Sequence, residues 1–418
     1  MNDPLLDMIV QHYESYSLKD EDALKLHLLD AMATGFAARN KAPKIRGIDG
    51  EVPSLEGKNS LDSAAFVNTF LIRYLDFNDT FLGLEPLHPS DMIGGLLALG
   101  YARDLTGEDL LRAMGLGYDV SVALCRTTSL RRKGFDHVNF LGIGSTVALA
   151  SMLSLSHEKL RNAISLTVVP HVALRESRSG TLTHWKAGAA AEAVRNSLFA
   201  TLLAESGIEG PPLPFYGKYG FVSVVANDMK LEEFRPDREV INVALKEFPV
   251  EYHAQAAVEA SLKVNTEGEI KEVLVETYDA AISILADKEK WNPTNRETAD
   301  HSLPFIVSYS ILEKNFWLDS YSHILDQGVR DVMGKVKVKE VPEFTSMYPR
   351  KLPVRINVVS RINDSSYVDV PKGYPGNPMT WHDVEMKAIR LGLPESVINM
   401  LSHIEDVKVK EIVMELSR

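Results

Sequence analysis

The sequence predicts a mainly α protein in which a large all-helical domain is interrupted by a smaller α+β domain. Up to residue 240, apolar residues recur at spacings of three and four, as in amphipathic helices. Between residues 241 and 378, runs of alternating β-branched residues indicate strands, and helical spacing returns after residue 378. We therefore expect the helical domain to comprise residues 1–240 and 379–418, and the α+β domain residues 241–378.

The expected helices of the first part follow one another closely. Residues 3–16 and 20–38 form amphipathic helices, and Asp20 is placed to cap the second. The alanine-rich segment at residues 184–207 ends at Gly207, a typical C-terminal cap. Further helices are expected at residues 64–74, 92–102, 108–124 and 157–169, with a loop and a buried helix within 138–156.

The expected α+β domain contains short strands and helices. A cluster of glycine and proline at residues 371–378 marks its end. Strands are expected at residues 239–245, 270–277, 335–341, 354–360 and 366–370, and helices at 252–263, 302–315, 325–334, 381–391 and 395–401, the last two beyond the domain.

Composition and charge exclude several classes of protein. The formal net charge of −12 argues against nucleic acid as a partner, because binding phosphates requires a basic surface. The chain has a single cysteine, Cys125, so it cannot form an intramolecular disulfide. The N-terminus lacks the basic and apolar regions of a signal peptide, and no run is apolar enough for a membrane span. We therefore expect a cytoplasmic protein.

The most informative stretch is Leu75 to Asp91, where several carboxylates, a threonine and a histidine fall between two apolar segments. Polar residues on an irregular connection between buried helices often carry function. Asp76 and Asp79 are three positions apart and could share a helical face as a capping pair, whereas His88 precedes a proline and should be extended. A capped helix end followed by a tight turn explains this pattern equally well.

Other titratable groups occur in clusters. The three cations from Arg131 to Lys133, followed by His137, could form a pocket for a multiply charged anion, although a solvated turn is the more common explanation of such a run. Three more clusters are Lys186 in THWKAG, Lys246 with Glu251 and His253, and Asp300 with His301.

The chain lacks the motifs of several common sites. It has no HExxH, no cysteine pair and no P-loop, and Gly142 and Gly144 lack the third glycine of a dinucleotide site. It also lacks the GxSxG motif of a serine nucleophile. We therefore expect no metal and no cofactor, and acid/base chemistry by histidine, lysine and aspartate on an anionic substrate.

Several segments together resemble the MmgE/PrpD family over nearly the whole chain. They are LDFNDT and HPSD within 75–91, GFDHVNFLG at 134–142, SGTLTHWKAG at 179–188, FPVEYHAQ at 248–255, ADHSLPF at 299–305 and KGYPGNPMTW at 372–381. Members are 2-methylcitrate dehydratases, cis-aconitate decarboxylases and related enzymes acting on small polycarboxylates. The resemblance implies a helical domain with an α+β lid, a homodimer, and a metal-free active site between the domains.

The resemblance also assigns residues to the pocket. Carried over position by position, it places Asp76, Thr80, His88, His137, Lys186 and Lys246 in or near the pocket. Two positions depart from the decarboxylase branch, which has a histidine where this chain has Glu251 and a tyrosine where it has Phe305. The sequence is thus more similar to the dehydratase branch.

We therefore predict a dehydratase that removes water from 2-methylcitrate or a similar acid. The predicted catalytic residues are Asp76, His88, His137 and Lys186, with Thr80, Arg132, Lys246 and His253 binding substrate. In this hypothesis His88 or Asp76 removes the proton, protonated His137 assists departure of the hydroxyl group, and Lys186, Lys246 and Arg132 stabilise developing charge.

Three alternatives remain open from the sequence. Decarboxylation of cis-aconitate is one. Epimerisation or isomerisation next to a carboxylate is another, since it begins with the same removal of a proton. A non-catalytic polycarboxylate-binding protein is the third, although binding alone would need cations and no base.

Overall fold

The computed structural model describes residues 2–179 and 182–417, and it is mainly helical with only small sheets. The chain forms two compact units, which are considered separately. Unit 1 comprises Met1–Ala244 and Thr380–Arg418, and unit 2 comprises Leu245–Met379. Gly180 and Thr181 of the SGTLTHWKAG segment lie outside the described residues.

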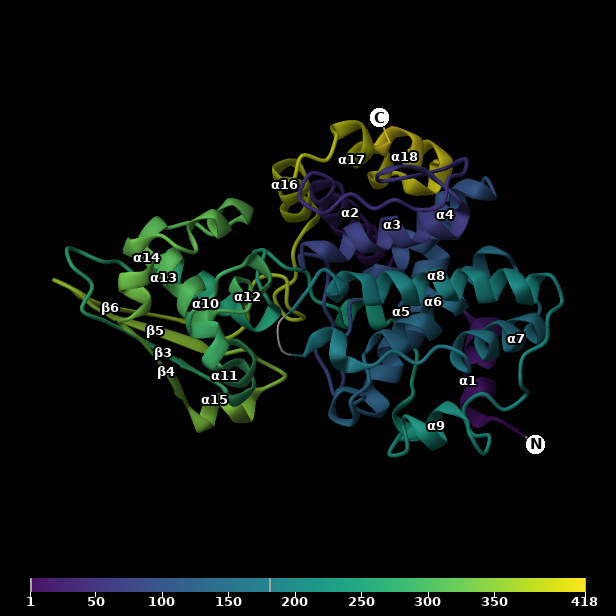
Figure 1. Ribbon diagram of the computed structural model, residues 1–418, viewed down its shortest axis with the longest axis horizontal. Coiled ribbons are helices and arrows are strands. Elements are labelled where there is room, and N and C mark those ends of the chain that lie inside the picture. The colour runs from purple at the N-terminus through teal and green to yellow at the C-terminus, as the bar shows by residue number, and fades with distance from the viewer. Residues whose placement is uncertain (1, 180–181, 418) are drawn as a thin grey trace. The chain divides into compact units, whose positions relative to one another are not determined.

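Unit 1 is built from helices with one small hairpin (Figure 1). Asp3 caps its first helix, where its carboxylate accepts a hydrogen bond from the Leu6 amide. The helices are α1 (Pro4–Ser15), α2 (Glu21–Ala38), α3 (Leu61–Tyr74), α4 (Ile93–Ala102), α5 (Gly107–Thr127), α6 (Val138–Met152), α7 (His157–Val168), α8 (Trp185–Glu205), α9 (Phe221–Val224), α16 (Trp381–Arg390), α17 (Glu395–Ser402) and α18 (Val409–Leu416), and the hairpin strands are β1 (Val52–Ser54) and β2 (Gly57–Asn59).

The centre of unit 1 is formed by helices that are buried on nearly every face. In α6 almost every residue is buried, and α5 packs closely against it. Gly144 permits this approach, because a Cβ atom there would lie 2.7 Å from the carbonyl oxygen of Gly117. Although these helices are apolar, no helix in the described part of the chain has the length and hydropathy to cross a membrane.

The C-terminal segment returns to unit 1 and packs beside the N-terminal helices. In Figure 1 the yellow helices α16 and α17 lie next to the purple α2, which they contact. Lys387 of α16 is buried and donates from Nζ to Asp30 Oδ1 of α2 at 2.5 Å and to the carbonyl oxygen of Phe77 at 2.9 Å. The last helices thus hold the segment that follows α3.

Unit 2 contains a four-stranded sheet with the order β4-β3-β5-β6. Strand β3 (Glu272–Thr277) pairs in parallel with β4 (Val336–Glu340) and antiparallel with β5 (Val354–Val359), which pairs antiparallel with β6 (Asn363–Val368). Alternate residues of β3 are buried, as expected for one covered face. The helices are α10 (Gln255–Lys263), which contacts β5 and β6, α11 (Asp279–Leu285), α12 (Arg296–Ala299), α13 (Leu303–Glu313), α14 (Gln327–Met333) and α15 (Pro342–Met347).

Three local expectations were wrong. Residues 239–245 form no strand, because a 3-10 helix (Glu239–Asn242) begins where the Glu239 amide donates to Asp119. The hairpin β1–β2 interrupts the part expected to be entirely helical. Asp20 does not cap α2 with its side chain, because its carboxylate is paired with Arg238.

Candidate active site

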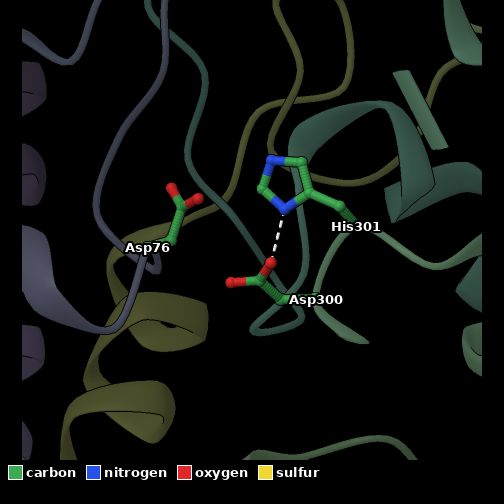
Figure 2. A group of neighbouring side chains, drawn as sticks. All are labelled: Asp76, Asp300 and His301. Carbon is green, nitrogen blue, oxygen red and sulfur yellow. Dashed lines mark hydrogen bonds and ion pairs between the residues drawn. The ribbon is translucent and has the colours of Figure 1, made fainter. Parts of the chain in front are cut away.

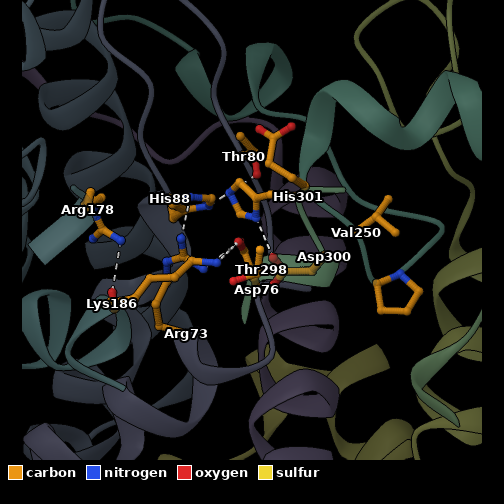
Figure 3. A network of polar contacts seen from close by, with 12 residues as sticks. Arg73, Asp76, Thr80, His88, Arg178, Lys186, Val250, Thr298, Asp300 and His301 are labelled. Atoms are coloured by element: carbon orange, nitrogen blue, oxygen red, sulfur yellow. Dashed lines mark hydrogen bonds and ion pairs between the residues drawn. The ribbon is translucent and has the colours of Figure 1, made fainter. Parts of the chain in front are cut away.

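Asp76 stands at the centre of a buried ion-pair network in unit 1. It follows α3 with a φ of 51°, in the left-handed region that non-glycine residues seldom adopt. Its Oδ1 accepts from Arg73 Nη1 at 2.6 Å, and its Oδ2 lies 2.6 Å from Lys186 Nζ at the start of α8 (Figure 3). Asp76 is 3% exposed, so these contacts are made largely out of water. Two cations from separate helices therefore hold one carboxylate in a strained backbone conformation.

Asp79 makes an entirely different set of contacts. Its Oδ1 accepts from the amide and the hydroxyl of Ser90, at 3.1 and 2.7 Å. Its Oδ2 accepts from the Tyr118 hydroxyl at 2.7 Å and lies 2.8 Å from His27 Nδ1. The expectation that Asp76 and Asp79 share a helical face was therefore wrong: the backbone leaves the helix at Asp76, and Asp79 ties the loop to α2 and α5.

His88 is held by contacts at both ring nitrogens. Nδ1 lies 2.7 Å from the carbonyl oxygen of Asp79 and 3.2 Å from Thr80 Oγ1, and Nε2 lies 2.9 Å from Arg73 Nη2. A guanidinium group only donates, so Nε2 carries the lone pair, and Nδ1–H donates to the carbonyl oxygen. In this arrangement the lone pair of His88 is directed at Arg73.

His137 belongs to a second buried cluster in unit 1. Its Nδ1 lies 3.2 Å from Asp136 Oδ1, and Asp136 Oδ2 lies 3.1 Å from Arg178 Nε. Burial favours the neutral form of Asp136, yet Arg178, His137 and Ser177 hold its pKa well below the usual range. Burial, together with Arg178, lowers the pKa of His137 to about 3, against the opposing effect of Asp136. His137 is therefore neutral near pH 7.

Arg178 links the two clusters. Its Nη1 donates to the carbonyl oxygen of Lys186 at 3.0 Å, as Figure 3 shows, while its Nε donates to Asp136. Its Nη2 is buried and has no hydrogen-bond partner among residues 2–179 and 182–417. The start of α8, which positions Lys186, is thus tied to the residues around His137, and Arg178 retains an unused donor.

Asp91 is a buried carboxylate near Arg73 of the Asp76 network. It accepts from Asn78 Nδ2 at 2.8 Å and lies 3.7 Å from Arg73 Nε. Burial raises its pKa to about 7; Arg73 opposes this shift and Asp79 adds to it. Asp91 is therefore partly protonated at neutral pH.

In unit 2, the partly buried Glu251 pairs with the buried His253. His253 Nδ1 lies 2.9 Å from Glu251 Oε1, and Nε2 lies 3.5 Å from the Tyr348 hydroxyl. Burial acts to raise the pKa of Glu251, but His253, His301 and Lys246 together bring it to about 2. Glu251 is therefore an ionised, partly buried carboxylate.

Two further expected residues of unit 2 lie near this pair. Lys246 is 1% exposed, and its charge contributes to the low pKa of Glu251. His301 Nδ1 is hydrogen-bonded to the adjacent Asp300 (Figure 2).

Phe305, at the position where the decarboxylase branch has a tyrosine, is fully buried and packs on Phe316 and Tyr321.

The structure brings some of the expected residues together and leaves one apart. Asp76, Thr80, His88 and Lys186 belong to the network around Arg73, and His137 is its neighbour, with its ring centroid 5.7 Å from that of His88. Arg132 lies in the 3-10 helix Arg131–Lys133 with an exposed side chain, and the adjacent Lys133 pairs with Asp228. Arg131 and Lys133 are partly buried in this turn, and an anion pocket at these three cations stays a prediction.

Sequence reasoning missed Arg73, Arg178 and Asp136. A signal existed for Arg73, a lone cation at the end of an apolar helix and three positions before Asp76. None existed for Arg178, which lies in a short polar segment. Together these residues give unit 1 buried cations beside carboxylates and two imidazoles, a combination suited to binding an anionic substrate and moving a proton.

Two family models and several curated relatives match this chain. Residues 9–233 match the model of the MmgE/PrpD N-terminal domain, and residues 248–397 match that of the MmgE/PrpD C-terminal domain. The chain is 30% identical over 411 residues to the 2-methylcitrate dehydratase of Escherichia coli K12, covering 88% of this chain and 83% of that protein.

Two more distant relatives extend the comparison. The 2-methylcitrate dehydratase of Cupriavidus necator is 27% identical over 412 residues, covering 88% of this chain and 84% of that protein. An alkylcitrate dehydratase of a fungal species is 25% identical over 432 residues, covering 90% and 85%. Because the two family models together match most of the chain, the protein belongs to the MmgE/PrpD family.

Proposed function

We propose that the protein is a dehydratase that removes water from 2-methylcitrate, or from a citrate with a similar alkyl branch, to give the corresponding cis-aconitate. Relatives similar over most of the chain carry the names 2-methylcitrate dehydratase and alkylcitrate dehydratase. The departures at Glu251 and Phe305 weigh against decarboxylation.

The observation that carries this proposal is the set of buried cations in unit 1. Arg73, Lys186 and Arg178 have side chains that are only 3%, 13% and 11% exposed. Burying that much positive charge is costly unless anions share the site. Asp76 and Asp136 neutralise part of this charge, and the carboxylates of a citrate would supply the rest, with Arg178 Nη2 as a ready donor.

The reaction places specific demands on these groups. A proton next to a carboxylate is weakly acidic, so its removal requires a base and cations that stabilise the charge spreading onto the carboxylate. Lys186 and Arg73 already contact one carboxylate, that of Asp76, and can exchange part of this contact for a substrate carboxylate as charge develops. Lys246 and His253 of unit 2 stay predictions for substrate binding.

The proposed chemistry uses no metal. Arg73 and Lys186 pair with Asp76, and the sequence offers no metal-binding motif. Charge stabilisation would then come from side-chain cations.

The test is incubation of the purified protein with 2-methylcitrate, citrate and cis-aconitate, followed by mass spectrometry. Loss of water from 2-methylcitrate at a rate unchanged by dialysis against a chelator supports the proposal. Loss of carbon dioxide from cis-aconitate would make the protein a decarboxylase. Saturable binding without turnover would make it a polycarboxylate-binding protein.

A further inference from the structure

Within the proposed dehydration, on which this inference rests, we propose that His137 is the residue that takes the substrate proton, through Nε2. Asp136 is its positioning residue, which holds the imidazole in the tautomer that leaves Nε2 unprotonated. The sequence suggested other roles: His88 or Asp76 as base, and a protonated His137 as acid.

The ionised Asp136 favours one tautomer of His137. Asp136 is fully buried and accepts from Ser177 Oγ at 2.5 Å, from Arg178 Nε at 3.1 Å and from the Val138 amide at 3.2 Å. His137 Nδ1 lies 3.2 Å from Asp136 Oδ1 in an ion-pair contact, and the negative charge of an ionised carboxylate favours a hydrogen on that nitrogen. The lone pair of the neutral ring then lies on Nε2.

The Nε2 atom of His137 is placed to accept a proton. It is buried and has no hydrogen-bond partner within the described part of the chain, and His137 is 4% exposed. A buried polar atom without a partner costs free energy, so such an atom next to buried cations points to a ligand that completes it. A carboxylate on one nitrogen and an open lone pair on the other is the arrangement by which an imidazole serves as general base.

The neighbouring histidine lacks this feature. The rings of His88 and His137 are 5.7 Å apart, but Nε2 of His88 already accepts from Arg73 and its Nδ1 donates to the Asp79 carbonyl oxygen. Removing a proton through His88 would first require breaking its contact with Arg73. His88 is therefore better suited to orienting Arg73 than to acting as base.

The charged groups around His137 keep it neutral. Burial and Arg178 lower the pKa of His137 to about 3. Arg73 and Arg175 also lower this pKa, and Asp136 acts to raise it. The lone pair is therefore present at every pH above about 4. A bound polycarboxylate brings negative charge against the same arginines, which raises the pKa of His137 and makes it a stronger base in the complex.

Dehydration moves one proton from the substrate to His137 and another onto the leaving hydroxyl group. The substrate C–H bond breaks and its proton passes to His137 Nε2, while the electron pair forms the C=C bond. The C–O bond breaks on the adjacent carbon, and the hydroxyl group leaves as water with a proton from an acid, for which the Lys186 ammonium is the candidate. Solvent then carries the proton from His137 back to that acid.

The first test does not depend on turnover. In protein labelled with ¹⁵N at histidine, the His137 signals are identified by their absence in His137→Asn. We expect a neutral ring protonated at Nδ1 from pH 5 to pH 8, and a change to the Nε2-protonated tautomer in Asp136→Asn, whose amide can donate to Nδ1. A protonated ring, or an Nε2–H tautomer, in the wild-type protein at pH 7 would overturn the proposal.

The second test is kinetic. Asp136→Asn should lower kcat by on the order of 10²- to 10⁴-fold with little change in KM, and Asp136→Glu should recover part of the rate. The control is Asp326→Asn, the same substitution in the exposed pair with His323, which should leave kcat unchanged. A merely structural Asp136 would instead lower Tm and leave the kcat of the folded fraction intact.

The third test is chemical rescue. His137→Ala should lose most of its activity and regain part of it with added imidazole, with rescue increasing as more of the imidazole becomes neutral. His88→Ala should show no such rescue. Rescue of His88→Ala alone would transfer the role of base to His88. If the wild-type protein dehydrates none of the acids, the proposed function fails, and the ¹⁵N spectra still decide whether Asp136 sets the tautomer.

Discussion

At the scale of single residues, Lys186 and Arg73 share one carboxylate, that of Asp76. If Lys186 also stabilises the charge that grows on the substrate, Lys186→Met should lower kcat by roughly 30- to 1,000-fold, equivalent to about 2–4 kcal/mol. Because Arg73 contacts the same Asp76, the Arg73→Met and Lys186→Met effects should not be additive. Steady-state kinetics of the two single variants and the double variant measure this coupling.

The kinetic comparison of Lys186→Met and Arg73→Met has a matched control. Lys263→Met removes a cation from an exposed pair with Glu259 on one helix, where little effect on rate is expected. Near-normal kcat/KM in Lys186→Met would remove this lysine from the active site.

Also at this scale, Asp91 gives the fold a pH dependence. Its pKa is about 7 in the folded protein, against an ordinary value of 3.8, so the unfolded chain loses this proton first as pH rises. The stability contributed by protonated Asp91 is therefore complete below about pH 4 and declines up to about pH 7, by about 1.4 kcal/mol per pH unit. Asp91→Asn cannot ionise, so its Tm relative to wild type should rise between pH 5 and pH 8.

Thermal melts across this pH range check the prediction. Arg73, Asp79, Asn78 and Arg178 surround the same carboxylate and are present in both proteins, so the difference between the two curves isolates Asp91. A constant difference in Tm over the whole range would show that Asp91 does not titrate there.

At the scale of secondary-structure elements, α16 anchors the segment that carries Asp76. Lys387 neutralises Asp30 and donates to the carbonyl oxygen of Phe77, the residue after Asp76. Lys387→Met leaves the Asp30 carboxyl buried without its partner cation, so the free energy of unfolding should fall by about 3–5 kcal/mol. Adding Asp30→Asn should restore most of that loss. Urea unfolding followed by circular dichroism measures both effects.

The control is Lys408→Met in α18's N-terminal cap, whose pair with Asp104 is about half exposed on each side. It should leave stability nearly unchanged, because an exposed ion pair is screened by solvent. Equal effects of the two lysine substitutions would mean that α16 does not stabilise the fold through this buried pair.

At the scale of the whole molecule, we expect a homodimer formed through unit 1. Several large apolar side chains there are exposed, among them Leu174 at 63%, Trp185 at 51% and Phe199 at 58%, and a second copy would cover them. Light scattering should give about twice the mass of 46.4 kDa, and Phe199→Asp should shift the protein towards monomer. A wild-type protein of monomer mass at micromolar concentration would refute the expectation.

The sequence predicted elements well where one face or the whole surface is apolar. The helix α6 follows from a long uncharged and mostly apolar run, and the strand β3 follows from residues that alternate at strand spacing. The prediction of a strand at residues 239–245 was wrong. Val240 and its neighbours alternate like a strand, but they form a 3-10 helix that begins where the Glu239 amide donates to the Asp119 carboxylate. A contact made 120 positions away cannot be read from local spacing.

The sequence by itself determined the family motifs, the mainly helical character and the residue types near Asp76. It could not determine the partners of each group, since Asp136 and Arg178 are 42 positions apart and meet only when η3 (Arg175–Arg178) folds against the start of α6. Tertiary structure alone decided that Nε2 of His88 faces Arg73 while Nε2 of His137 is open. The physical reason is that hydrogen bonds are directional: the partner of one ring nitrogen sets the role of the other, and packing chooses that partner.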